Sequence, residues 1–346
     1  MPTLNKAKKE TQIILKWGGI SFVIIILFFM GIRLLTFVRN LFVPPPPPQA
    51  SFGKLPAIPF PNLVKENISY SLDTLTGYLP NFSDRAKVYK ITSDPPTLLG
   101  LDKTRGKVAQ IGFTSLGTQI SEDTYQWVDQ TSSLQRRITM NIFSSDFTLS
   151  SSYLVTQSLQ AFSGPDEKNR ATELAKSLLS GISLFPQDID ENKIKITSYS
   201  IEKSTLIPTS KISNTKIVRV DFFQKDLDGL PIYYDKGISS TIDFLIGKDN
   251  NQLKVVDARF FHKNISETAS TYAIKTASQA FSELQKGKAY IAYKPNDTVE
   301  FTIEKVFLGY YIGEDQQDFL MPIVVFKGNN DFVAYVSAVR DEWINN

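Results

Sequence analysis

The chain has 346 residues, with 38 Lys and Arg against 35 Asp and Glu, a single histidine and no cysteine. The lack of cysteine excludes disulfide bonds, thiolate metal sites, a cysteine nucleophile and a lipid-modified cysteine anchor. The nearly even charge balance lacks the concentrated basic surface of a nucleic-acid-binding protein, so we expect no nucleic-acid partner.

The first predicted element is a membrane-spanning helix at residues 17–38, which read WGGISFVIIILFFMGIRLLTFV. In a helix these residues reach about 33 Å, enough to cross the hydrocarbon core of a bilayer. A buried helix of a globular domain rarely lacks a polar face, and a cleaved signal peptide has a shorter apolar region and a small-residue cleavage site. The pattern therefore predicts an uncleaved single-pass anchor.

The flanking charges predict the orientation of this anchor. Four lysines precede the run, whereas only Arg33 and Arg39 lie at its far end. By the positive-inside rule, residues 1–16 form a cytoplasmic tail and the C-terminal bulk is extracytoplasmic. We expect localisation in the cell membrane, with the membrane itself as one partner.

Residues 39–69 read as a proline-rich linker. The five prolines Pro44 to Pro48 favour polyproline II, a stiff spacer of about 15 Å. A ligand for a proline-recognition domain is the alternative, but the predicted location favours a stand-off between membrane and domain.

Past the linker, apolar periodicity predicts three units, at residues 70–164, 165–265 and 266–346. The expected helices cover residues 105–113, 166–182 and 270–284. The expected strands cover residues 86–91, 123–129, 134–143, 195–199, 215–223, 232–234, 239–246, 253–261, 299–311, 319–326 and 332–339. One helix per unit beside antiparallel hairpins predicts an α+β fold of tandem helix-on-sheet units, of the PepSY or cystatin kind.

Turn-forming residues separate the expected strands, as in KDLDGLP at 225–231. Asp226, Asp228 and Gly229 superficially match a calcium loop. The twelfth position of that loop should be Glu, but it is Gly237. We therefore expect a hairpin turn here and no metal site.

Two segments resemble known bacterial families. Val220–Phe261, with Asp228, Gly229 and Pro231 in its "dG-x-P" hairpin, is similar to PepSY-like and YycH/YycI-like domains. Val306–Val339 resembles the last unit of such proteins. The resemblance spans Tyr70 to Val339 and consists of turn and core residues. It implies an extracytoplasmic, single-span protein, and some members of the group restrain a partner sensor kinase.

Catalytic patterns are scarce. His262 stands alone, which argues against the usual zinc sites and Ser-His-Asp triads. The acidic pairs Asp188/Asp190 and Glu314/Asp315 lie in polar, loop-like runs, and we interpret them as solvated. We therefore expect no catalytic, cofactor-binding or metal-binding residues, and no cofactor.

The leading hypothesis is a non-enzymatic, membrane-anchored binding or regulatory protein in signal transduction, acting on an envelope partner such as a sensor kinase. An envelope hydrolase with a carboxylate pair is the alternative from another class, and it needs two acids converging in a pocket. A structural assembly subunit of the envelope is the third hypothesis.

Overall fold

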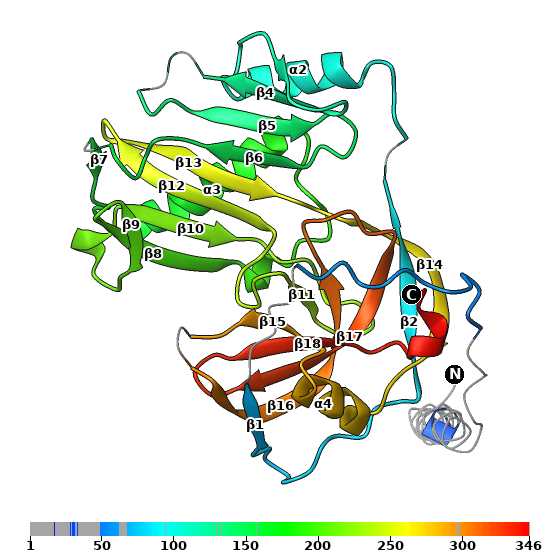
Figure 1. Ribbon diagram of the computed structural model, residues 1–346. Helices are drawn as coiled ribbons and strands as arrows, with labels where there is room; N and C mark the ends of the chain where they lie inside the picture. The colour runs from blue at the N-terminus through cyan, green and yellow to red at the C-terminus, as the bar shows by residue number, and fades with distance from the viewer. Residues whose placement is uncertain are drawn as a thin grey trace, which may run out of the picture. The chain divides into compact units, whose positions relative to one another are not determined.

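The computed structural model describes residues 49–61, 68–93, 95–129, 131, 133–156, 158–295 and 298–345, with five isolated positions between 17 and 33. Residues Gln49–Asn346 form one compact unit. Two large β-sheets make up most of this unit, and three α-helices pack on them (Figure 1).

The predicted membrane anchor is corrected by the structure. Residues 17–38 lie outside the described part of the chain, apart from the five isolated positions. No described helix is long and apolar enough to cross a membrane. The longest described helix, Pro165–Gly181, is amphipathic and has 17 residues, whereas a membrane-spanning helix needs about 20 mostly apolar residues. The expected single-pass membrane localisation is therefore not supported.

The first sheet has ten strands, in the order β3-β4-β5-β6-β13-β12-β10-β8-β9, with β7 paired to β12. Its strands are β3 (Thr118–Gln119), β4 (Thr124–Val128), β5 (Arg137–Asn141), β6 (Phe147–Ser150), β7 (Leu159–Gln160), β8 (Lys195–Glu202), β9 (Thr205–Pro208), β10 (Ile217–Asp221), β12 (Ile242–Asp249) and β13 (Gln252–Phe260). Helices α2 (Gly100–Gln110) and α3 (Pro165–Gly181) cover one face of this sheet. Their buried side chains, such as Val108 and Leu179, join Phe244 of the sheet in one apolar core.

The second sheet has eight strands, with the central order β1-β16-β17-β18-β15. Its strands are β1 (Ser69–Leu72), β2 (Arg85–Thr92), β11 (Ile232–Tyr234), β14 (Asn264–Ala273), β15 (Tyr290–Tyr293), β16 (Glu300–Ile312), β17 (Phe319–Gly328) and β18 (Val333–Ser337). Helix α4 (Ala277–Gln285) packs on one face through Ala280 and Leu284. The segment before β1 packs on the sheet with Leu55 and Ile58 in a second core.

The predicted α+β fold of tandem units is wrong, because the structure is mostly β and its sheets are not built unit by unit. Strand β2, expected in the first unit, pairs with β14 and β17. Strand β1 pairs in parallel with β16. Apolar periodicity indicates which residues form strands, but it does not show which distant strand is the partner. The strands therefore form two large sheets through long-range pairing, and not the separate small sheet that was expected in each unit.

The helix predicted at residues 270–284 is only partly right. Residues Asn264–Ala273 form strand β14, and the helix begins at Ala277. Pairing with β2 overrides the helical spacing of the alanines here, as tertiary contacts often override local preference. The helix begins at a capping box, in which the Thr276 hydroxyl accepts from the Gln279 backbone NH at 3.2 Å and the Gln279 side chain accepts from the Thr276 NH at 2.9 Å.

We predict that Thr276→Ala lowers the free energy of unfolding by about 1 kcal/mol, because the NH of Gln279 loses its acceptor. Thr276→Ser keeps the hydroxyl and should stay close to the wild type. Urea unfolding of both variants is the measurement, and an equal loss in both would contradict the assigned cap.

Candidate functional site

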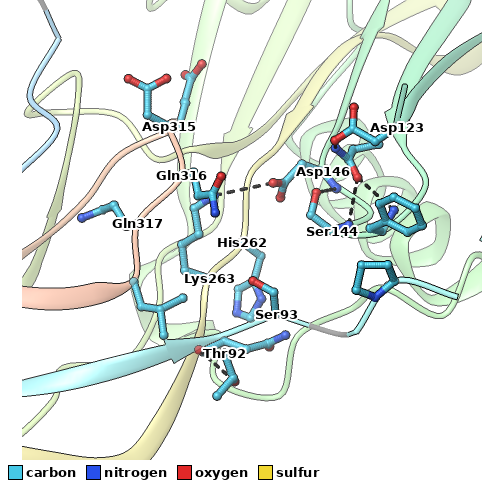
Figure 2. A pocket seen from close by; sticks show the side chains of 16 residues that line it. Thr92, Ser93, Asp123, Ser144, Asp146, His262, Lys263, Asp315, Gln316 and Gln317 are labelled. Atoms are coloured by element: carbon cyan, nitrogen blue, oxygen red, sulfur yellow. Dashed lines mark hydrogen bonds and ion pairs between the residues drawn. The ribbon is translucent and has the colours of Figure 1, made fainter. Parts of the chain in front are cut away.

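A cleft with a volume of about 460 Å³ lies between side chains of the two sheets (Figure 2). The ten-stranded sheet contributes the β5–β6 turn, and the eight-stranded sheet contributes the end of β2 and the β16–β17 turn. The connection from β13 to β14, residues 261–263, passes from one sheet to the other beside it. The polar lining residues are Thr92, Ser93, Asp123, Asn141, Ser144, Asp146, His262, Lys263, Asn264, Glu314, Asp315, Gln316 and Gln317.

His262, the lone histidine, is held in a structural pair. Its Nε2 lies 2.9 Å from Oδ1 of Asp188, and Gln224 donates to the other oxygen of this carboxylate at 2.7 Å. Burial acts to raise the pKa of Asp188, but the hydrogen bonds from His262 and Gln224 outweigh it and leave the pKa below its ordinary value. The same Gln224 amide donates to the backbone carbonyl of Lys263 at 3.2 Å. This network therefore fixes the β13–β14 connection.

Asp123 is also fully engaged by neighbouring donors. Its carboxylate accepts from Ser121 at 2.9 Å, Thr124 at 3.0 Å and Asn141 at 2.7 Å. The hydrogen bond from Ser121 contributes most to a pKa below the usual range, and those from Thr124 and Asn141 add to it. Asp123 is thus ionised at neutral pH and shapes the turn.

Asp146 and Lys263 face each other less tightly. The Lys263 ammonium lies 3.5 Å from Oδ2 of Asp146, longer than the roughly 2.8 Å of a good charge-assisted hydrogen bond. Among the described residues, Oδ1 of Asp146 is buried without a hydrogen-bond partner. Burial raises the pKa of Asp146, against the opposing charge of Lys263. Lys263 itself is only 8% exposed. Both groups therefore keep unused hydrogen-bonding capacity at the cleft.

The acidic pairs interpreted as solvated have mixed outcomes. Asp188 pairs with His262, Asp190 caps a short 3-10 helix (Glu191–Lys193), and Glu314 forms an ion pair with Arg259, so these three are not free in solvent. Asp315 is exposed at the cleft, in agreement with the prediction.

The predicted hairpin turn at Asp228 and Gly229 is confirmed. Both residues have positive φ, and the backbones of Leu227 and Leu230 exchange two hydrogen bonds. The described residues contain no group of three or more His, Asp and Glu placed to hold a metal.

Sequence reasoning missed the cleft's own residues, Asp123, Asp146 and Lys263. Each stands in an ordinary polar run, and no motif spacing connects them. One weak signal was present in the sequence: Lys263 follows His262 just after a predicted strand. A lysine in such a place is usually solvated, so this signal did not indicate a site.

A charged cluster lies on the ten-stranded sheet beside the cleft. Arg259 pairs with Asp243 at 2.6 Å and with Glu314 of the β16–β17 turn, and so joins the two sheets. Arg219 lies 3.0 Å from Asp221 and 3.4 Å from Asp243. These ion pairs extend on the face of the sheet that α2 and α3 do not cover.

Asp257 belongs to the same cluster, but it forms no ion pair with any residue that the structure describes. Burial, together with the negative charge of Asp243, raises its pKa to about 7, and the charge of Arg259 opposes this shift only in part. Ionised Asp257 therefore destabilises the folded chain.

Comparisons with known proteins give no family. No family model matches the chain, and no curated protein matches it. A crystal structure of an uncharacterized protein from Eubacterium rectale is similar over 80% of this chain and 90% of that one, with a TM-score of 0.39 and 15% identity. The C-terminal domain of YpeB from Bacillus megaterium is similar over 72% of this chain and 95% of that one, with a TM-score of 0.34 and 9% identity.

These likenesses are too low to carry an argument about family. The resemblance to PepSY-like domains stays a prediction, and the resemblance to YycH/YycI-like domains is not confirmed.

We predict that Asp257→Asn stabilises the chain above pH 7 and has no effect near pH 4. The folded pKa of Asp257 lies above its ordinary value, so its contribution to stability is complete at low pH and is lost as the pH rises to about 7. At 1.36 kcal/mol per pKa unit, discounted for partial exposure, the gain at pH 8 is about 2 kcal/mol.

Chemical unfolding at pH 4, 6 and 8 is the measurement, with Asp73→Asn at an exposed position as the control. A gain of equal size at every pH would contradict the assignment of the effect to this carboxylate.

Proposed function

We propose that the chain is a non-enzymatic binding and regulatory protein and that the cleft between the two sheets is its recognition site. One observation carries this proposal: the cleft is lined by polar side chains from both sheets, including Ser144 from one and Gln316 from the other. A ligand in the cleft would contact both sheets at once.

The state of the carboxylates in the cleft favours binding over catalysis. Asp123 accepts three hydrogen bonds, and Asp188 holds His262 and Gln224. A general acid or base must be free to exchange a proton with substrate, with a pKa near the working pH. These two groups are instead committed to the protein and held ionised.

Regulation follows from the position of the cleft. The β13–β14 connection and the Arg259–Glu314 pair both join the sheets beside it. A ligand can shift a conformational equilibrium only by its different affinity for the two states, and contacts to both sheets provide such a difference. We propose that occupancy of the cleft controls the action of the chain on a protein partner, such as the sensor kinase that some members of the resembled families restrain.

One observation favours a second candidate, a hydrolase with a carboxylate pair. Asp146 and Asp123 line the same cleft, and their pKa values are shifted in opposite directions, upward for Asp146 and downward for Asp123. A carboxyl of raised pKa in the same cleft as a carboxylate of lowered pKa is the combination that glycosidases use.

We predict that a photocrosslinking amino acid at position 316 captures a specific molecule in cells, whereas the same probe at position 252 does not. Both positions are exposed glutamines, Gln316 in the β16–β17 turn and Gln252 at the start of β13, but only Gln316 lines the cleft. Mass spectrometry of the adducts is the measurement. Identical adducts from both positions, or none from either, would sink the proposal.

Asp146→Asn separates the two candidates, because an amide cannot donate a proton as a general acid. If the protein is a hydrolase, hydrolysis of a polysaccharide substrate by the full chain should be detectable and should fall by about a hundredfold or more in this variant. If it is a binding protein, the wild type shows no hydrolysis and the crosslinked adduct still forms.

A further inference from the structure

We propose that the cleft binds a neutral, polyhydroxylated ligand, such as a short oligosaccharide. This inference rests on the proposed function, because it takes the cleft to be the recognition site. It is carried by the hydrogen-bonding groups that the protein leaves unused there.

The lining side chains fall into two sets. Some serve the protein: Asn141 accepts from the backbone NH groups of Phe143 and Ser144, and Gln317 bonds to the backbone of Gly313 and Tyr311. The others make no hydrogen bond to the protein through their side chains, as far as the chain is described. These are Ser93, Asn264, Asp315 and Gln316.

The unused set contains donors and acceptors in similar measure. The amides of Asn264 and Gln316 each offer both, the Ser93 hydroxyl does the same, and Asp315 accepts. A sugar hydroxyl is likewise both a donor and an acceptor. A ring bearing several hydroxyls therefore matches this mixed, solvent-exposed lining, whereas a group that only donates or only accepts matches part of it.

The pair of Asp146 and Lys263 also has unused hydrogen-bonding capacity, here at a buried position. Oδ1 of Asp146 is buried and has no donor among the described residues, while the ammonium of the nine-tenths-buried Lys263 is 3.5 Å from Oδ2. A single ligand hydroxyl can donate to the carboxylate and accept from the ammonium. A buried acceptor without a donor is unfavourable, so a ligand that donates to Oδ1 of Asp146, which has no partner among the described residues, gains affinity.

The charged groups and the volume of the cleft limit the class of ligand further. The carboxylates of Asp123, Asp146 and Asp315 disfavour an anion. A cation would be repelled only by the ammonium of Lys263, so trilysine is included below as the cationic probe. The side chains of Phe143 and Pro96 add apolar surface, on which the C–H face of a sugar ring can pack. The volume of about 460 Å³ lies in the range of small-molecule sites, roughly 300–1,000 Å³.

Calorimetric titration of the full chain with cellotriose, maltotriose and chitotriose tests the proposal, with trilysine and trialanine as peptide probes. We expect at least one trisaccharide to bind at millimolar concentration or below and neither peptide to bind. Gln316→Ala and Asn264→Ala, whose side chains make no hydrogen bond to the described protein, should each weaken that binding by about tenfold. Gln252→Ala is the matched control and should leave it unchanged.

Three outcomes would overturn the inference: no trisaccharide binds, a peptide binds more tightly, or the cleft variants bind as the wild type does. The proposed function fails separately. If crosslinking at position 316 captures a specific molecule but no trisaccharide binds, the cleft is a recognition site for another class of ligand. If both experiments are negative, both proposals fall.

Discussion

The short connection between β13 and β14 is the constraint on which the rest of the structure depends. One strand belongs to the ten-stranded sheet and the next to the eight-stranded sheet, with only residues 261–263 between them. The backbone NH of Phe261 donates to Thr241, whose hydroxyl donates back to the Phe261 carbonyl, and the Gln224 amide donates to the Lys263 carbonyl. With its backbone fixed at both ends, the connection has little freedom to shift, so His262 and Lys263 are placed by the fold.

Local features of the fold could be predicted from the sequence, because they depend on neighbouring residues. The turn at Asp228 and Gly229 needs positive φ, which these residue types tolerate. The apolar residues of helix α3 recur at helical spacing in the sequence, so this helix could be predicted directly. The pairing of β2 with β14 could not be predicted in this way. It joins residues far apart in the chain, and nothing in the alternation of β2 distinguishes one partner from another.

The same reason explains why the cleft was missed. Asp146 lies in the β5–β6 turn and Lys263 in the connection after β13, and they meet only because β6 pairs with β13. By contrast, the structural role of His262 could be predicted in part from the sequence. A lone histidine at a strand end has few catalytic options, and here it stacks on Phe260 and bonds to Asp188. The chemistry of a single residue can be predicted, whereas a juxtaposition of two requires the topology.

The cleft combines groups that stabilise the fold with groups that do not. Asp123, Asp188 and Gln317 each hold a turn or the connection through short hydrogen bonds, so the walls are rigid before any ligand arrives. A rigid site spends less binding free energy on ordering its own side chains. Lys263 is the exception, since burying its charge beside a carboxylate 3.5 Å away costs stability that an apolar side chain would not. That cost is offset if the ammonium pairs with a group outside the protein. The carboxylate of Asp146 in the same ion pair has one oxygen with no hydrogen-bond partner among the described residues, so both members of the pair can accept a ligand group.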